Sequence, residues 1–323
     1  MLQKLLRIGH QVLWASIASA LVLLALVVSL GRYYMPQISV YQAEILAQLH
    51  QHIKLDFDIG RIEGEWRGLT PVLRLHDFRL LNDAGELVVE TKYLAVYVDL
   101  LDSLWHQTPL LQTVSLADAR ISLEKYENGQ WALRGFEPVA TASSNNPAEF
   151  VLSQLALLEM TGVQIKVHLN EDSVHLVNNA SLVLRKSFKL YNLTAELAGQ
   201  DGRRQLRLVA EMDGWLDKPS SLLGYLELEA FDLGSVSPLL GELHDKLPPQ
   251  FSGKLWLDWG ALKGWNVQGE LALPAWEIAG LAQRELATLH ELSFTFKGEA
   301  MPGRALEFSF RDVAFDWYGR SFL

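Results

Sequence analysis

The sequence predicts a mainly β protein, in which one N-terminal transmembrane helix is followed by an elongated, curled antiparallel sheet with few helices. Three observations support this prediction. A long uncharged apolar run lies near the N-terminus, apolar and polar residues alternate with a period of two through most of the remaining chain, and Gly, Asn, Asp and Pro gather between the alternating runs. Strands that follow one another in this way favour an antiparallel sheet with one apolar and one polar face.

The composition excludes several classes of protein. The 323 residues contain 28 Lys and Arg against 38 Asp and Glu, which gives a formal net charge of −10, and there is no cysteine. Without cysteine the chain has no disulfide framework, no cysteine-ligated zinc site and no thiol nucleophile. A nucleic-acid partner is not expected, because its phosphates would require a surplus of basic side chains. Hydrophobic residues make up 49% of the chain, too many for intrinsic disorder.

Residues 12–30 form the uncharged run and predict a membrane anchor. As a helix, these nineteen residues are about 28 Å long, close to the thickness of the hydrocarbon core. Lys4 and Arg7 precede the run, so the positive-inside rule predicts a cytoplasmic N-terminus and places the chain after Arg32 across the membrane. The anchor residues that we expect to lie in the lipid include Val12, Trp14, Leu21, Leu24, Val28 and Leu30.

A cleavable signal peptide is the alternative interpretation of the same run. Its apolar core is usually about 7–15 residues long and ends in a small-x-small site, to which the end of this run is a weak match. Arg32, Tyr33 and Tyr34 are instead typical of the interfacial residues that flank a membrane span. We therefore expect residues 1–34 to remain attached as a cytoplasmic tip and transmembrane anchor.

A second, amphipathic helix is expected directly after the anchor. Apolar residues recur there at steps of three and four, and Pro36 suits the first turn of a helix. We expect this helix to cover one end of the sheet. The residues on its apolar side are Ile38, Tyr41, Ile45, Leu49 and Ile53.

Beyond residue 54 the hydrophobic period changes from 3.6 to 2 and stays so nearly to the end of the chain. The alternation predicts strands whose apolar side chains share one face of the sheet. Aromatic residues occur in both alternating sets, so the sequence leaves open which face is turned inward. The apolar residues that we expect to line a groove are Leu94, Val96, Val98, Ile121, Leu123, Val163, Ile165, Val167, Leu206, Leu208, Leu226 and Leu228.

Two further expectations concern how the sheet is divided. An Asn-Gly pair at residue 128 predicts a hairpin turn, and the small, polar segment 141–147 predicts a surface linker. We place a boundary there, between a helix plus first sheet segment (35–145) and a continued sheet segment (146–323). A strand pattern runs almost to the last residue, and an open sheet edge invites aggregation, so we expect the second segment to be truncated at its C-terminus.

Motifs for catalysis are missing from the sequence. It contains no Gly-rich phosphate loop after a strand, no Gly-x-Ser-x-Gly elbow and no His-Glu-x-x-His helix. One weak candidate is His168 with His175. The other is a pair of carboxylates on adjacent strands, of the kind that glycosidases use, for which the sequence offers Asp99, Asp102, Glu227 and Glu229. Histidines and carboxylates are ordinary on the solvated face of a sheet. We therefore expect no enzymatic activity, no catalytic residues, no cofactor and no metal site.

The order of the motifs resembles a known family. After the anchor and the helix, residues 57–71 read FDIGRIEGEWRGLTP and residues 73–80 read LRLHDFRL. Residues 95–104, AVYVDLLDSL, and residues 230–240, AFDLGSVSPLL, extend the likeness. Through these motifs the chain is similar to the N-terminal region of the AsmA-like superfamily, and most closely to its YhdP branch.

The resemblance implies a fold, a location and a function. The fold is a β-groove of the bridge-like lipid-transfer type, and the location is the bacterial inner membrane, with the bulk of the chain in the periplasm. The implied function is passive transfer of phospholipid acyl chains between the inner and the outer membrane. Outer-membrane or periplasmic proteins are the partners implied at the distal end.

Two other functions stay open. One is a structural or assembly factor of the cell envelope that acts on outer-membrane proteins without carrying lipid, and the other is a membrane-tethered β-sandwich hydrolase. A continuous apolar face must be covered by a second layer, closed into a barrel or left for a lipid. A two-layer sandwich would favour the assembly factor. One amphipathic helix is too little to cover a sheet of this length, which favours an open trough that shelters acyl chains.

Overall fold

The computed structural model describes residues 2–52, 56–68, 70–82, 84–106, 110–126, 131–136, 155–170, 173–199, 202–215, 218–232, 250–282, 285–301, 307–317 and 320–322. The helices are α1 (Leu2–Tyr34), the 3-10 helix η1 (Met35–Tyr41), α2 (Gln42–His52) and α3 (Leu100–His106). The strands are β1 (Asp56–Arg67), β2 (Thr70–Leu81), β3 (Leu87–Asp99), β4 (Leu110–Lys125), β5 (Trp131–Leu133), β6 (Leu157–Asn170), β7 (Ser173–Ser187), β8 (Leu190–Ala198), β9 (Arg204–Trp215), β10 (Lys218–Asp232), β11 (Gln250–Gly260), β12 (Gly264–Ala282), β13 (Glu285–Ala300), β14 (Glu307–Trp317) and β15 (Arg320–Phe322).

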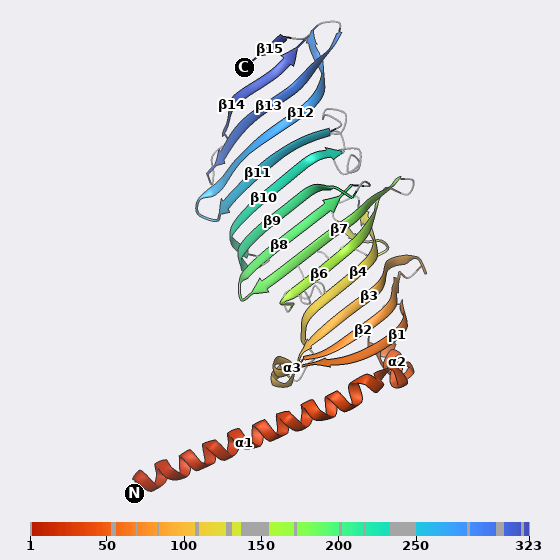
Figure 1. Cartoon of the computed structure of the whole chain (residues 1–323), viewed down its shortest axis with the longest axis vertical. Coiled ribbons are helices and arrows are strands. Elements are labelled where there is room, and N and C mark those ends of the chain that lie inside the picture. Colours follow the sequence, from red (N-terminus) through yellow and green to blue (C-terminus); the bar gives the residue numbers. More distant parts are fainter. Residues whose placement is uncertain are drawn as a thin grey trace.

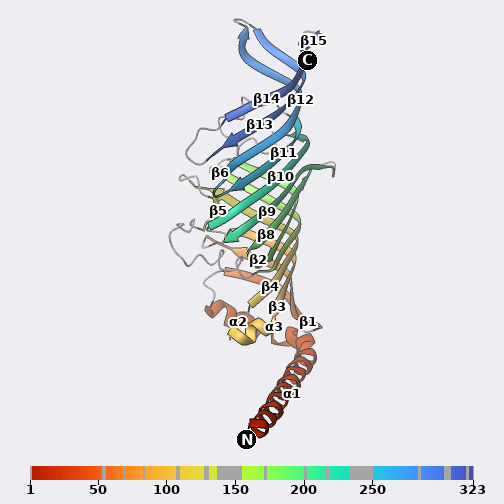
Figure 2. The same ribbon diagram turned by 90° about the vertical axis from the view of Figure 1, so that its left-hand side faces the viewer.

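All of these strands belong to one open sheet. Its order is β1-β2-β3-β4-β6 and then β7 to β15 in sequence, with β5 paired to β4 outside this path. Figure 1 shows the strands stacked into an elongated, twisted sheet with α1 projecting from the β1 end, and the view in Figure 2 shows the sheet curling along its length. The prediction of a mainly β chain with one apolar N-terminal helix and a long curled sheet is confirmed.

One strand pair departs from the antiparallel arrangement that the sequence predicts. β4 and β6 pair in parallel, with Thr113 beside Leu157 and Glu124 beside His168. A parallel pair requires the chain to return to the starting end of the first strand, and β5, which pairs antiparallel with β4, begins this return. Side chains alternate with a period of two in both orientations, so the pattern that predicts a strand does not predict its direction.

Several expectations fall on residues outside the described part of the chain. These are the Asn-Gly turn at residue 128, the linker 141–147 and the boundary at residue 145. The division into two segments therefore stays a prediction. The strands on either side of it hydrogen-bond to each other as members of the same sheet, through β4 and β6.

The expected helix after the anchor is present and packs on β1. Its first part is the 3-10 helix η1, with Pro36 near its start, and α2 continues it. The buried residues Phe57, Ile59 and Ile62 form the core that it covers. The expectation for Tyr41 is wrong: we expected it on the packed side, and it is 52% exposed at the end of η1. The side chains packed against this core are Ile38, Ile45, Leu46, Leu73, Leu75, Phe78 and Leu80.

The end of α1 is held against the turn between β1 and β2 by close packing. The indole ring of Trp66 lies over Gly31, and η1 lies over Gly64, so that a Cβ atom at either glycine would overlap its neighbour. Arg32 Nη2 donates a hydrogen bond to the carbonyl oxygen of Gly68 at 3.3 Å, and Trp66 Nε1 donates to the same oxygen at 3.0 Å. The apolar helix therefore positions the first strand of the sheet directly.

A crease crosses the first strands of the sheet, where single residues adopt a positive φ. These residues are Asp77 in β2, Asp118 in β4, Gly162 in β6 and Asn179 in β7, with φ of 52°, 53°, 63° and 54°. Asp and Asn tolerate this left-handed region better than most residues do. At the crease the alternation of side chains shifts by one position, so that Ile59 and Ile62, three residues apart, belong to the same core.

Thr91 lies in β3 at this crease and is fully buried. Its hydroxyl donates to the carbonyl oxygen of Ala117 at 2.8 Å, with the carbonyl oxygen of Tyr93 also within reach at 3.0 Å. The same hydroxyl accepts a hydrogen bond from the Tyr93 N–H at 3.3 Å. The side chain thereby satisfies backbone groups that the irregular ladder would otherwise leave unpaired.

We predict that Thr91→Val lowers the free energy of unfolding by about 1–3 kcal/mol, because an isosteric apolar side chain leaves buried backbone groups without a partner. The matched control is Thr194→Val on β8, a half-buried position, which should change stability by less than about 0.5 kcal/mol. Chemical denaturation of the detergent-solubilised chain measures both. Equal midpoints for Thr91→Val and the unchanged protein would contradict this role for Thr91.

Candidate functional site

An unbroken row of apolar residues and one glycine crosses the sheet on one face. Directly paired residues on neighbouring strands point to the same side of a sheet, so the strand register traces the row. Every member is apolar or glycine. We call the side of the sheet that carries this row the apolar face. From β1 to β14 its members are Ile62, Leu75, Leu94, Leu116, Met160, Leu182, Ala195, Leu208, Leu226, Leu255, Gly269, Phe296 and Phe310.

The strand register also places the other predicted groove residues on the apolar face. Ile121 and Val89 are paired, and Val89 pairs in turn with Leu80, which packs against the buried core of β1. Val163 and Val167 are buried, whereas the other ten predicted residues are half-buried. Contact of these side chains with lipid stays a prediction. A second row runs beside the first, through Val163, Ala180, Leu197, Leu206 and Leu228.

The part of the apolar face farthest from α1 is aromatic, and our predicted lining residues did not include it. The rings of Trp259 and Trp265 lie 5.6 Å apart, and the rings of Phe294 and Phe310 lie 5.8 Å apart. Phe308 and Phe310 are 52% and 60% exposed. The signal for these residues was present in the sequence, since they alternate with polar residues as the aliphatic ones do.

Charged side chains pair with one another on the opposite face. Glu90 in β3 pairs with Arg79 of β2 at 3.3 Å and with Arg120 of β4 at 3.0 Å. Arg120 Nε also donates a hydrogen bond to Gln164 Oε1 of β6 at 3.2 Å. Ion pairs of this exposed kind contribute little to stability. Their value here is to show which side of the sheet is suited to water.

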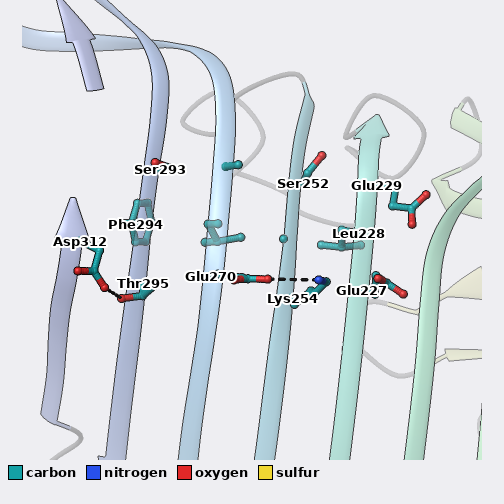
Figure 3. Close-up of a pocket in the computed structure, with 13 residues that line it drawn as sticks. Glu227, Leu228, Glu229, Ser252, Lys254, Glu270, Ser293, Phe294, Thr295 and Asp312 are labelled. Carbon is teal, nitrogen blue, oxygen red and sulfur yellow. Dashed lines mark hydrogen bonds and ion pairs between the residues drawn. The ribbon is translucent and has the colours of Figure 1, made fainter. Parts of the chain in front are cut away.

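The hollow drawn in Figure 3 also lies on the polar side, across β10 to β14. It measures about 540 Å³. Four of the residues that line it are register partners on neighbouring strands: Glu227, Lys254, Glu270 and Thr295. Lys254 Nζ lies 3.5 Å from Glu270 Oε1, and Thr295 Oγ1 donates to Asp312 Oδ2 at 3.1 Å, as the dashed lines show.

The carboxylates of Glu227 and Glu229, considered above as hydrolase candidates, are paired with an arginine. Glu227 and Glu229 both form ion pairs with Nη2 of Arg204, at 3.4 and 3.5 Å. One guanidinium therefore holds both carboxylates. Among the described residues no group of three or more His, Cys, Asp or Glu is arranged to bind a metal ion.

The two histidines considered as a pair occupy register positions on opposite faces. His168 lies beside Glu124, on the polar side, and the register partner of His175 is Val167, on the apolar side. The expectation of a solvated histidine is wrong for His168, which is 8% exposed. Burial lowers the pKa of His168 below its usual value, and the positive charge of Arg134 lowers it further.

The lowered pKa predicts how stability depends on pH. Well above pH 6.5 His168 is neutral in both the folded and the unfolded chain, so the free energy of unfolding does not depend on its protonation there. Below pH 6.5 the unfolded chain binds a proton that the folded chain does not, so the free energy of unfolding falls. His168→Gln should therefore lose less stability than the unchanged protein between about pH 7 and pH 5. Chemical denaturation at a series of pH values measures the free energy of unfolding of both chains. An equal fall for the two chains between about pH 7 and pH 5 would contradict this prediction.

α1 contains the residues predicted to anchor the chain. The helical stretch Leu13–Ala47 is the one candidate membrane span among the described residues, and its apolar window is not buried in the protein. Trp14, Leu21 and Leu30 are 59%, 61% and 48% exposed. This helix is compatible with single-pass anchoring in a membrane.

Comparison with known proteins identifies the family of the chain. The family model described as YhdP protein matches residues 1–320. No curated protein and no solved structure matches the chain. Because the family match extends over nearly the whole sequence, the chain belongs to the YhdP protein family.

Proposed function

We propose that this protein transfers phospholipid passively along its apolar face. In this proposal α1 anchors the chain in the inner membrane with its N-terminus in the cytoplasm, and the sheet extends through the periplasm towards the outer membrane. Outer-membrane or periplasmic proteins would receive the lipid at the distal end. The observation that supports this most strongly is the unbroken row from Ile62 to Phe310, in a sheet whose family and open form fit a lipid-transfer protein.

The energetic problem that such a row solves is the cost of exposing an acyl chain to water. At about 0.8 kcal/mol per methylene, a saturated chain of about sixteen carbons costs about 12 kcal/mol to hydrate. That cost would slow unassisted transfer by about nine orders of magnitude. A lipid tail that moves between similar apolar contacts stays out of water at every step. Movement along the face then requires no chemical reaction, only a difference in lipid supply between its ends.

The length of the row suits several lipids rather than one. With about 4.8 Å between neighbouring strands, the twelve steps from β1 to β14 span about 58 Å. This is about twice the thickness of a bilayer's hydrocarbon core. Phe308 and Phe310 are exposed, so the apolar face at β14 is accessible to a ligand.

A single charge in the middle of the row tests the proposal. A carboxylate in a hydrocarbon environment costs about 2.5–3.5 kcal/mol, so Leu208→Asp should slow lipid transfer about 100-fold. Val209, the next residue in β9, pairs with Thr194 and Tyr225 on the opposite face, and Val209→Asp is the matched control. The assay measures transfer of radiolabelled phospholipid from inner to outer membrane in cells that depend on each variant.

The same pair of variants separates transfer from an assembly role. A structural factor that carries no lipid should tolerate Leu208→Asp as well as Val209→Asp, provided that both chains accumulate to the same level. Equal transfer rates for the two variants would therefore contradict the proposal and support the assembly factor.

Bound lipid is the second expectation. The chain purified in a mild detergent should carry phospholipid that native mass spectrometry detects as a ladder of added masses, because the half-buried apolar face retains acyl chains. Leu208→Asp should shorten this ladder, and Val209→Asp should leave it unchanged. If the full chain purified from membranes carries no phospholipid, this result would count against transfer along this face.

A further inference from the structure

α3 replaces a tight turn between β3 and β4 and presents a tryptophan to the outside. Trp105 is 84% exposed on this seven-residue helix. The helix is fixed to both strands, because the Asp102 N–H donates to Asp99 Oδ1 at 3.0 Å and the Leu110 N–H donates to Ser103 Oγ at 2.9 Å. Trp105 is therefore an exposed side chain on a helix that hydrogen bonds fix to the sheet.

The strand ends next to α3 lie on the same side of the sheet as the strand ends that α1 meets. We call this row of strand ends, formed by the ends of β1 and β3 and the starts of β2 and β4, the rim. β1 ends where β2 begins, with Arg67 beside Thr70, and β3 ends where β4 begins, with Asp99 beside Leu110. The hydrogen bond from Arg32 of α1 reaches the β1–β2 turn on this rim. Figures 1 and 2 both show α3 at the end of the sheet next to α1, and in Figure 1 the helix α1 passes beneath α3.

We propose that Trp105 inserts into the headgroup layer of the membrane that α1 spans, and so seats this rim of the sheet on the lipid surface. The proposal rests on the anchoring role of α1 in the proposed function. Tyr33 and Tyr34, at the end of α1, are 66% and 55% exposed, and tryptophan and tyrosine gather at membrane interfaces because each combines an apolar ring with a polar group. Trp105 extends this aromatic group from α1 to the sheet.

Seating the rim in this way has a consequence for lipid entry. Val98 and Leu111, which flank α3 on β3 and β4, are paired at the same rim, and Val98 alternates with Val96 on the apolar face. When Trp105 lies among the headgroups, these side chains lie next to the level at which acyl chains begin. α3 then brings the start of the apolar face to the lipids it would accept.

The chain has no cysteine, so one introduced cysteine carries a unique label. Trp105→Cys is labelled with an environment-sensitive fluorophore, and the full chain is reconstituted into vesicles of phosphatidylethanolamine and phosphatidylglycerol. The matched control is Leu262→Cys, in the turn between β11 and β12, a position 95% exposed but far from β1 along the sheet. Circular dichroism checks that both chains are folded.

The label at residue 105 should emit at shorter wavelength, be quenched by lipids with a spin label near the headgroup, and resist aqueous iodide. The label at residue 262 should show the reverse. Iodide quenching at residue 105 as strong as at residue 262 would overturn the proposal. Protection from iodide without quenching by labelled lipid would overturn it too, because a protein contact would then cover this position.

The outcome is separable from that of the proposed function. Bound phospholipid in a sample whose label at residue 105 stays in water would overturn the seating of α3 and leave lipid transfer standing. An inserted label in a chain that carries no phospholipid would support the seating and count against transfer.

Discussion

The hydrogen-bond register between strands determines most of what this molecule can do. Each pairing places one residue of a strand beside one residue of the next, and the chosen register lines up apolar side chains from Ile62 in β1 to Phe310 in β14. A shift by one residue in any pair would turn that strand's apolar set to the other side. Since the strands form one open sheet, its described part is a single layer with a continuous apolar face on one side and cross-strand ion pairs on the other.

The structure couples this face to the membrane helix at one end. η1 and α2 cover the core of β1, and the contact of Trp66 with Gly31 leaves no room for a side chain between α1 and the sheet. The end of the anchor therefore packs directly on the first strand. The fully buried Thr91 hydroxyl supports the crease, where the ladder is irregular.

Much of the architecture could be predicted from the sequence, because a period of two and an uncharged apolar run each have one main structural interpretation. The register puts the predicted groove residues on one face, although the sequence left open which set of side chains was turned inward. The crease was not predictable in this way, since residues such as Asp77 and Asp118 adopt a positive φ through their strand context. The sequence did not predict the parallel pairing of β4 and β6, because apolar and polar residues alternate in the same way in parallel and antiparallel strands.

The candidate site was harder to predict than the fold. Periodicity identifies apolar positions, but the exposed aromatic end of the face, with Phe308 and Phe310, becomes evident as part of the same surface only through the register. The burial of His168 was likewise not visible in its alternation with apolar neighbours. Side chains whose role depends on the neighbouring strand need the pairing to be known first.

Site-specific photocrosslinking along the row measures whether lipid occupies the apolar face. A photoreactive phenylalanine analogue placed in turn at Leu94, Leu208 and Phe310 samples the near, middle and far parts of the apolar face. If lipid travels along this face, all three positions crosslink phospholipid in intact cells, and Val209 on the opposite side does not. Equal crosslinking at Leu208 and Val209, or none at any position of the row, would contradict lipid transfer along this face.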